Sequence, residues 1–412
     1  MSEQRNTGQL EIPKLVRAYQ REWLARTRER VSQGEPFIIC NGDDYEDMAN
    51  AMDIPVIVIN YWHSLISMKG LAEYYYDVLA KKGYPSDYSF ALGLACSMDR
   101  DPEMAPWGGL PKPLVILGGA REDREYRVVE LWAREMGATF WPLECALWHA
   151  VEKPPGPNWW ERIRDHWDEF VNPYKLDLRV EQEKELTKYI EVATGKRLTI
   201  DKLTETAELV NEQMDYWKMA HDLIAATVPC PARVRDQLSM YQTMWHRGTP
   251  TGRDFIKSYY EEVKDRVEKG IAACPNEKIR LMWLISLGTP PAWGQWAEDT
   301  YNAVCVASGY SAIPFDGYPR TILDNDPGRA LAARHMLMSW TSPDWHLKET
   351  LDHQCDGIVV ATTGGSSGSR KELTDYCDKV GMPIVEIPYN KDDEKVRAII
   401  SEFIETHLSA KL

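Results

Sequence analysis

One pattern recurs along this chain and limits what it can fold into: a short apolar run, a turn, a helix-like segment and a second apolar run. Its plainest copy spans residues 356–387, where the runs Ile358–Ala361 and Pro383–Ile387 flank a turn rich in glycine and serine. This order is typical of two parallel strands joined by a helix. Open α/β sheets bind ligands at the carboxyl ends of their strands, so the turn is a candidate ligand site.

The same pattern occurs three more times, at residues 37–59, 113–144 and 280–310. Two copies therefore lie in each half of the chain, although they are not repeats in sequence. Between them, residues 159–273 read as almost entirely helical, and residues 10–33 as an amphipathic helix. We predict an α/β fold with two lobes of parallel sheet flanked by helices.

The length of the chain, 412 residues, is too great for one ordinary hydrophobic core. The pattern places an N-terminal helix at residues 1–34 and a first α/β lobe at 35–157. A mainly helical linking region follows at 158–275, and a second α/β lobe at 276–412.

Composition excludes some classes of function. The formal net charge of -15 argues against a nucleic-acid surface and against an anionic membrane. No apolar run is long enough to span a bilayer, and the N-terminus lacks the apolar core of a signal peptide, so we expect a cytoplasmic protein. The eight cysteines are scattered singly without zinc-type spacing, which argues against structural disulfides.

The glycine-rich turn has two interpretations. Gly364, Gly365, Ser366 and Ser367 could present backbone N–H groups to an anion, or they could form a plain flexible turn. The turn matches neither the dinucleotide-binding nor the phosphate-loop motif.

Two side chains that can move protons follow the first pair of strands. Glu46 comes shortly after the first strand and His63 shortly after the second, so an acid–base pair could face one crevice. The alternative for Glu46 is a favourable interaction with the helix dipole. The alternative for His63 is a structural role in the core.

Lone cysteines give a weaker signal. Cys96 precedes a polar stretch, and Cys145 lies just past a predicted strand, but a single cysteine is more often a small core residue.

Together these segments resemble the family of 2-hydroxyacyl-CoA dehydratase D-components and benzoyl-CoA reductase subunits. The resemblance covers essentially the whole chain and rests on YEDMANAMDIPVIV, CSMDR, PLVIL and DGIVVAT, in the family's order and rough spacing. It implies a heterodimer with a homologous partner subunit. It also implies a 4Fe-4S cluster held by three cysteines, and a separate ATP-hydrolysing activator that delivers a low-potential electron to an acyl-CoA.

Carried over by position, Glu46 matches the glutamate of the family's first-strand motif and Cys96 its first cluster cysteine. Residues 118–122 contain no sulfur where the second cysteine is expected, and Ser366 stands where the third is expected. Iron–sulfur clusters need cysteine thiolates at nearly every site that the protein supplies. We therefore expect no conventional cluster on this subunit, no other cofactor or metal, and a 4Fe-4S cluster, if any, on the partner.

The resemblance leads to two hypotheses and a third, weaker one. In the first, the chain performs acid–base chemistry, such as hydration, dehydration or carbon–carbon cleavage, on an acyl-CoA in anaerobic metabolism. Gly118, Gly119 and Ala120 would line the CoA ester pocket together with the turn at 364–367. The 16 Trp and 20 Tyr suit an aromatic acyl group.

In the second hypothesis the chain is a catalytically silent subunit that only binds CoA or holds the heterodimer together. In the third it is a reductase or dehydratase subunit that carries a cluster with atypical ligands.

Overall fold

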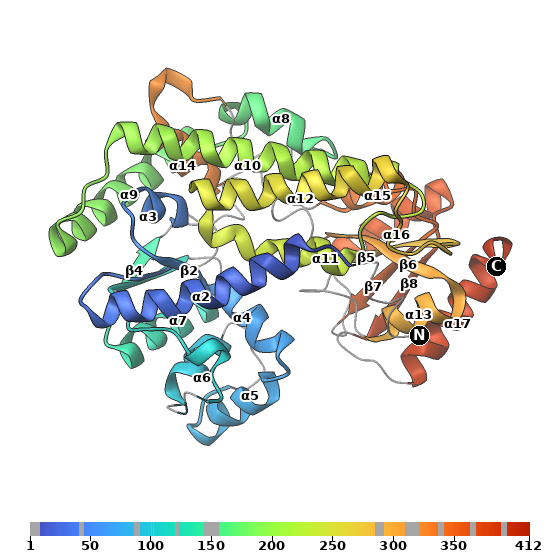
Figure 1. Ribbon diagram of the computed structural model, residues 1–412, viewed down its shortest axis with the longest axis horizontal. Helices are drawn as coiled ribbons and strands as arrows, with labels where there is room; N and C mark the ends of the chain where they lie inside the picture. The colour runs from blue at the N-terminus through green and yellow to red at the C-terminus, as the bar shows by residue number, and fades with distance from the viewer. Residues whose placement is uncertain are drawn as a thin grey trace.

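The computed structural model describes most of the chain. The described residues are 9–40, 45–85, 91–99, 101, 103–119, 123–143, 156–284, 292–309, 321–336, 342–362, 368–388 and 394–412. They form two four-stranded parallel sheets with helices packed against them, which confirms the predicted α/β fold (Figure 1).

The first sheet has the strand order β2-β1-β3-β4. Its strands are β1 (Ile38–Cys40), β2 (Val56–Val58), β3 (Val115–Gly119) and β4 (Thr139–Leu143). All of its neighbouring strands pair in parallel, so their carboxyl ends meet at one edge. The central strands are apolar and buried, as expected for strands covered on both faces.

The second sheet repeats this topology with the order β6-β5-β7-β8. Its strands are β5 (Ile279–Leu284), β6 (Ala303–Ser308), β7 (Gly357–Thr362) and β8 (Ile384–Pro388), again all parallel. All four strand pairs predicted from the sequence are confirmed. In both sheets the strand order reverses beside the first strand, which is the switch point where α/β sheets form their ligand crevice.

Several helices accompany the first sheet, and the last of them, α7, follows β3. They are α3 (Glu46–Ala51), α4 (Ile59–Met68), α5 (Ala72–Lys81), α6 (Leu92–Met98), η2 (Pro106–Gly108) and α7 (Asp123–Met136). Helices α4 and α5 are separated by a break. The break falls at Gly70, whose φ of +71° is left-handed and ends α4.

A layer of long helices follows, together with the N-terminal helix. It consists of α2 (Ile12–Ser32), α8 (Trp159–His166), η4 (Trp167–Glu169), α9 (Pro173–Thr194), α10 (Ile200–Ala226), α11 (Val234–Ser239), η5 (Met240–His246) and α12 (Pro250–Lys269). Local sequence sets the ends of these helices. Asn172 and Thr199 cap the starts of α9 and α10, and the left-handed Gly195 and Gly270 end α9 and α12.

The remaining helices accompany the second sheet along the chain. They are α13 (Ala292–Tyr301), η7 (Leu323–Asn325), α14 (Pro327–Met336), α15 (Pro343–Asp352), α16 (Gly368–Val380), α17 (Glu394–His407) and η8 (Ser409–Lys411). Helix α14 leaves the second sheet and packs against α9 and α10 (Figure 1). It thereby brings late residues of the chain to the first sheet.

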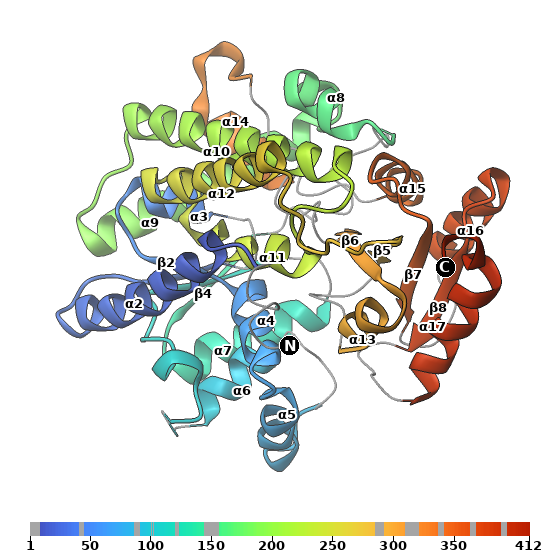
Figure 2. The same cartoon turned by 45° about the vertical axis from the view of Figure 1, so that its right-hand side comes forward.

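Alternate strand residues enter different cores, because side chains of a strand point to opposite faces. Ile38 and Cys40 of β1 join a core that also contains Met282 and Ile358 of the second sheet; we call this the shared core. Ile39 faces an outer core formed with α4 to α7. The opposite face of the second sheet has its own core under α13 and α17, which lie beside the strands in Figure 2.

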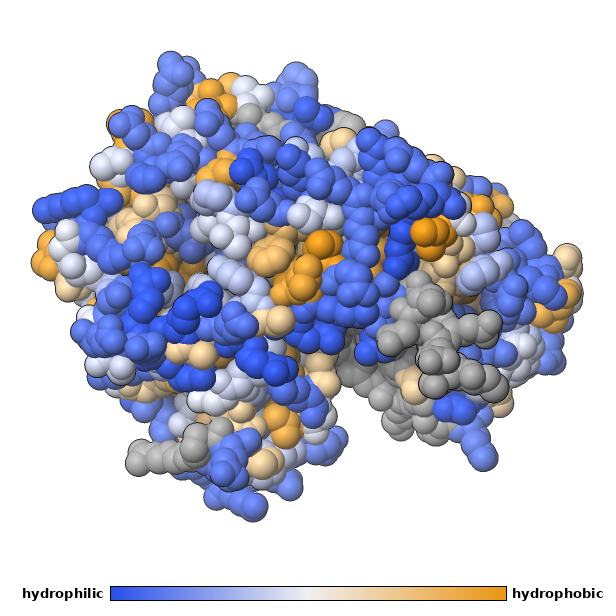
Figure 3. Space-filling model, viewed as in Figure 1, coloured by the Kyte–Doolittle hydropathy of each residue, from blue (hydrophilic) through white to orange (hydrophobic). Residues whose placement is uncertain are grey.

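The surface in the view of Figure 3 is mostly hydrophilic, with scattered apolar residues. Its lower edge is indented between the part with α4 to α6 and the part with the second sheet. Among the described residues, no helix combines the length and the hydrophobicity needed to cross a membrane.

Candidate functional site

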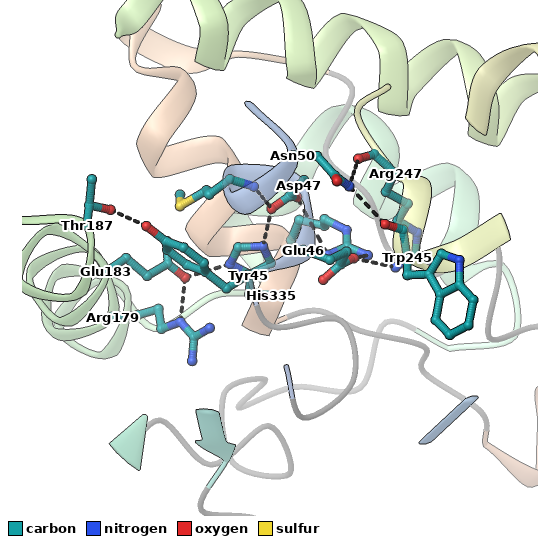
Figure 4. Close-up of polar contacts among 12 residues, drawn as sticks. Tyr45, Glu46, Asp47, Asn50, Arg179, Glu183, Thr187, Trp245, Arg247 and His335 are labelled. Carbon is teal, nitrogen blue, oxygen red and sulfur yellow. Dashed lines mark hydrogen bonds and ion pairs between the residues drawn. The ribbon is translucent and has the colours of Figure 1, made fainter. Parts of the chain in front are cut away.

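A network of charged side chains is buried where the helical layer meets the carboxyl end of β1 (Figure 4). Each of its members is at most 3% exposed: Glu46, Asp47, Arg179, Glu183, Arg247, Arg334 and His335. Burying so many charges is unfavourable unless each is paired, and such clusters concentrate at functional sites. The network is therefore the candidate functional site of this chain.

Glu46 is the first residue of α3 and lies at the edge where the parallel strands end. Its Oε1 is 2.9 Å from a guanidinium nitrogen of Arg334 and 3.2 Å from one of Arg247. Two positive groups therefore hold one carboxylate oxygen in a site without exposure to water. Arginine is suited to this because its rigid fork of N–H groups matches a carboxylate.

Asp47, the next residue, faces a different cation. Its Oδ1 is 3.0 Å from Nε2 of His335, whose Nδ1 is 2.6 Å from Oε1 of Glu183. Burial alone lowers the pKa of His335, but the carboxylates of Glu183 and Asp47 raise it well above its ordinary value. The imidazole is therefore a charged bridge between α3 and α9.

Further contacts fix this arrangement. Nε of Arg179 donates to Glu183 at 2.6 Å, and the Tyr45 hydroxyl bonds to Thr187. The amide of Asn50 donates to the backbone carbonyls of Trp245 and Arg247, which holds the end of η5 against α3. The site thus joins four parts of the chain that are distant in sequence.

His63, the second predicted proton carrier, lies in different surroundings. It is in α4, and its ring lies 6.0 Å from that of Trp132, a residue of the outer core, whereas the neighbours of Glu46 in α3 belong to the shared core. The structure therefore directs these two side chains to opposite faces of the first sheet. Burial lowers the pKa of His63 to about 3, so the ring is neutral near pH 7.

Cys96 lies in α6 and its side chain is buried in the outer core. Burial raises the pKa of its thiol to about 11, so it keeps its proton. Cys40 belongs to the shared core, Cys355 precedes β7 and Cys377 lies in α16. Within the described residues, no three cysteines come together, and Cys145 lies outside them.

Two of the predicted substrate-binding glycines, Gly118 and Gly119, lie at the end of β3. Gly118 pairs with Pro142 of β4, and a Cβ there would lie 2.5 Å from the Phe140 ring, so packing alone requires a glycine. Gly119 pairs with Leu143. Ala120, Gly364, Gly365, Ser366 and Ser367 lie outside the described residues.

A cavity of about 570 Å³ adjoins the network on the side of α9. Met48 and Glu183 form part of its wall, and α10 and residues 325–328 complete it. Its size falls in the range of small-molecule pockets. Of the predicted substrate-binding residues, the structure describes Gly118 and Gly119, and neither of these lines it.

The sequence analysis missed every partner of Glu46. Arg247 and Arg334 are 201 and 288 positions away from it in sequence, so no local motif connects them. One signal was present: Arg334 and His335 interrupt the otherwise apolar run ALAARHM of α14. Two charged residues that are fully buried in such a helix need partners.

A second cluster, formed by His221, Glu349 and His353, lies apart from this network in α10 and at the end of α15. In the described part of the chain, it is the one group in which three His, Cys, Asp or Glu side chains bring ligand atoms within 4.8 Å of one another, as a metal ion requires. The sequence analysis named no metal ligand.

Comparison with known proteins identifies the family. The model of the 2-hydroxyglutaryl-CoA dehydratase D-component family matches residues 48–407, which include strands β2 to β8 and helices α8 to α12 of the helical layer. No curated protein matches the chain. The family consists of dehydratase-type enzyme components that act on CoA thioesters. This chain, as the resemblance of its motifs implied, belongs to the 2-hydroxyglutaryl-CoA dehydratase D-component family.

Proposed function

We propose that this chain is a subunit of a 2-hydroxyacyl-CoA dehydratase-like complex that moves a proton on an acyl-CoA without a 4Fe-4S cluster of its own. The observation that carries the proposal is Glu46, buried at the carboxyl end of β1 between two guanidinium groups. The family match supports the CoA thioester as substrate. The abundance of Trp and Tyr favours an aromatic acyl group.

Hydration, dehydration and carbon–carbon cleavage next to a thioester have two needs in common. A side chain must accept or donate a proton, and positive charge must stabilise the negative charge on the carbonyl oxygen. Glu46 supplies a carboxylate for the first. Arg247 and Arg334 supply fixed positive charge for the second in a site that excludes water.

Of the two predicted proton carriers, Glu46 is the stronger candidate. A general base works best when its pKa is near the working pH, and burial lowers that of His63 to about 3. His63 also packs on Trp132 in the outer core, away from the charged network. We assign His63 a structural role and Glu46 the proton transfer.

We propose that this chain holds no 4Fe-4S cluster because its residues at the family's cluster positions offer too few sulfur atoms to ligate iron. Of the three positions where the family has cluster cysteines, only the one matched by Cys96 carries sulfur. We propose that a cluster, where the complex has one, is held by the partner subunit. No step on this chain is assigned to it.

A silent subunit, which binds CoA or only assembles the complex, is the second candidate. It is favoured by the full burial and double ion pairing of Glu46, which also suit a purely structural carboxylate. The two candidates differ in what happens when Glu46 loses its charge while the complex remains intact.

The test is Glu46→Gln in the purified complex, with His63→Gln as the matched control for a buried polar residue. A catalytic Glu46 predicts at least about a hundredfold loss of kcat on 2-hydroxyacyl-CoA or aromatic acyl-CoA thioesters, typical of a lost general base. His63→Gln should stay within about threefold, since its role is structural. Gel filtration and circular dichroism check that both complexes assemble and fold. Full activity of an intact Glu46→Gln complex would favour the silent subunit.

Cluster content is tested independently of catalysis. Anaerobic purification followed by iron and acid-labile sulfide analysis, with the co-purifying chains identified by mass, should give no sulfide on this chain alone. Near-stoichiometric iron together with sulfide on the isolated chain would contradict the cluster-free proposal.

A further inference from the structure

Three side chains with metal-ligating atoms meet between the helical layer and the second sheet. His221 comes from α10, Glu349 from the last turn of α15, and His353 directly follows that helix. One ligand atom from each lies within 4.8 Å of the others, and all three residues are buried. None of them belongs to the charged network around Glu46.

The three side chains of the trio lie close together. Nε2 of His221 is 2.7 Å from Oε2 of Glu349. Glu349 and His353 are four residues apart, so the helix puts them on the same face. The rings of His221 and His353 meet edge to face with centroids 4.4 Å apart.

One ring nitrogen of His353 already has its partner. Nδ1 lies 2.8 Å from the backbone carbonyl oxygen of Glu349, so Nδ1 carries the proton and Nε2 keeps a lone pair. Within the described part of the chain, Nε2 is buried without a hydrogen-bond partner. Histidines that bind metals commonly have this arrangement, in which the second ring nitrogen donates to a carbonyl or carboxylate oxygen.

Two positive side chains near the trio, Arg280 and Lys348, each pair with a carboxylate outside it. Arg280 donates to the backbone carbonyl of His353, and its guanidinium is paired with Glu277 at 2.8 Å. Lys348 is 3.6 Å from the other carboxylate oxygen of Glu349, but its own side chain is partly exposed and also pairs with Asp352. Oε2 of Glu349 therefore remains directed at the two histidines.

We propose that His221, Glu349 and His353 bind one divalent first-row transition-metal ion, which fastens α15 to α10. Two imidazoles and one carboxylate are a ligand set for Zn²⁺, with a fourth position open to water, and also for Fe²⁺. Zinc is the favoured ion, because two histidines and one glutamate with an open fourth position are a ligand set that proteins use for zinc.

The ion would act at a distance from the charged network. Helix α15 leads through Cys355 into β7, the central strand whose carboxyl end precedes the predicted CoA turn. Fixing α15 to α10 would therefore fix the second sheet on the helical layer. This inference is independent of the role assigned to Glu46.

The test uses the full-length chain after removal of any affinity tag. The protein is stripped with a chelator and titrated with Zn²⁺ by calorimetry, and with Co²⁺ by visible absorption. We expect one equivalent of tightly bound metal, visible d–d bands with Co²⁺ and a higher Tm with Zn²⁺. His221→Asn and His353→Asn should each weaken binding at least about tenfold.

His346→Asn is the matched control, because His346 is also a histidine of α15 and is partly buried, but it is not part of the trio. It should bind metal like the unaltered chain. Absence of d–d bands and of a Tm shift in the unaltered chain would overturn the proposal, and so would equal binding by all variants. The absence of d–d bands and of a Tm shift in the unaltered chain would count against the proposal even if a variant failed to fold.

Metal analysis of protein as purified identifies the ion. Zinc, or iron without acid-labile sulfide, at one equivalent supports the trio. Iron with sulfide would instead point to a cluster, and it would contradict the proposed function without bearing on the trio.

Discussion

Glu46 and Asp47 are neighbours in the chain, yet their closest cations differ. Glu46 is closest to arginines, whereas Asp47 is closest to His335 and has Arg334 only at 3.7 Å. Replacing one partner in such a site leaves the other as an uncompensated buried charge. Each ion pair therefore contributes to the structure chiefly by keeping α3 in one position relative to α9 and α14.

His335→Gln should lower the free energy of unfolding by about 3 kcal/mol, because Glu183 and Asp47 lose the cation between them. Urea unfolding followed by far-UV circular dichroism measures this. His166→Gln is the control, since the His166 side chain is 64% exposed and should change stability by less than about 0.5 kcal/mol. Equal effects of the two substitutions would contradict the bridging role of His335.

The same histidine predicts a dependence on pH. Its pKa is raised in the folded state, so the folded protein binds this proton more tightly than the unfolded chain does. Its contribution is fully present below the unfolded pKa of about 6.5 and is lost as pH rises through the higher folded pKa. Unfolding free energies measured at intervals from pH 6 to pH 10 should fall for the unaltered chain, and His335→Gln should remove that part of the slope.

At this scale the sequence pointed to one residue of the candidate site. Glu46 could be singled out because it follows a recognisable strand. Its cations could not, because α14 and the end of η5 reach it only through tertiary packing. The sequence also did not show that His63 and Glu46 lie on opposite faces of the first sheet. Each residue follows a strand, but its position in the sequence does not say on which face of the sheet the connecting helix lies.

Among the elements, the strands were the easiest to predict. Short apolar runs bounded by turns favour buried strands of a parallel sheet, and each of the four predicted segments contains, to within one residue, a pair of observed strands. Helices α14 and α15 were missed, since residues 311–355 show neither a clear period nor a strand run. Yet α14 carries Arg334 and His335, and α15 carries Glu349 and ends just before His353.

Helix α6 depends on a close approach to α7. A Cβ on Gly93 would lie 2.4 Å from Cη2 of Trp132, which the ring could not accommodate without moving. We expect Gly93→Ala to cost about 1–3 kcal/mol in unfolding free energy, as overpacking of a core does.

Gly328→Ala is the matched control for that substitution. Gly328 lies in α14 without a left-handed φ, and the nearest atom to an added Cβ is 3.5 Å away. Thermal unfolding should show an unchanged or slightly higher Tm, because alanine restricts the unfolded chain. Destabilisation of both variants to the same extent would mean that the Trp132 contact is not the cause.

On the scale of the whole molecule, the shared core connects both sheets. It contains Ile38 of β1, Val210 of α10 and Ile358 of β7, all fully buried. A continuous core of this kind favours a single cooperative unit over two lobes that unfold separately.

Hydrogen exchange read by mass spectrometry tests this cooperativity. The slowest amides of β1 and β7 should report the same unfolding free energy and should respond to urea with the same slope. A difference of more than about 2 kcal/mol between the two strands would mean that one sheet opens independently of the other.

The return of α14 to the first sheet has a consequence for how the protein is made. A ribosome produces the first sheet early, and amino-terminal parts of a chain generally fold first. Glu46 and Asp47 cannot meet Arg334 and His335 until α14 has been synthesised, 288 residues after Asp47. During that interval the nascent chain holds unpaired carboxylates at the edge of its first sheet, so completion of the site is a late event of translation rather than a property of the first lobe alone.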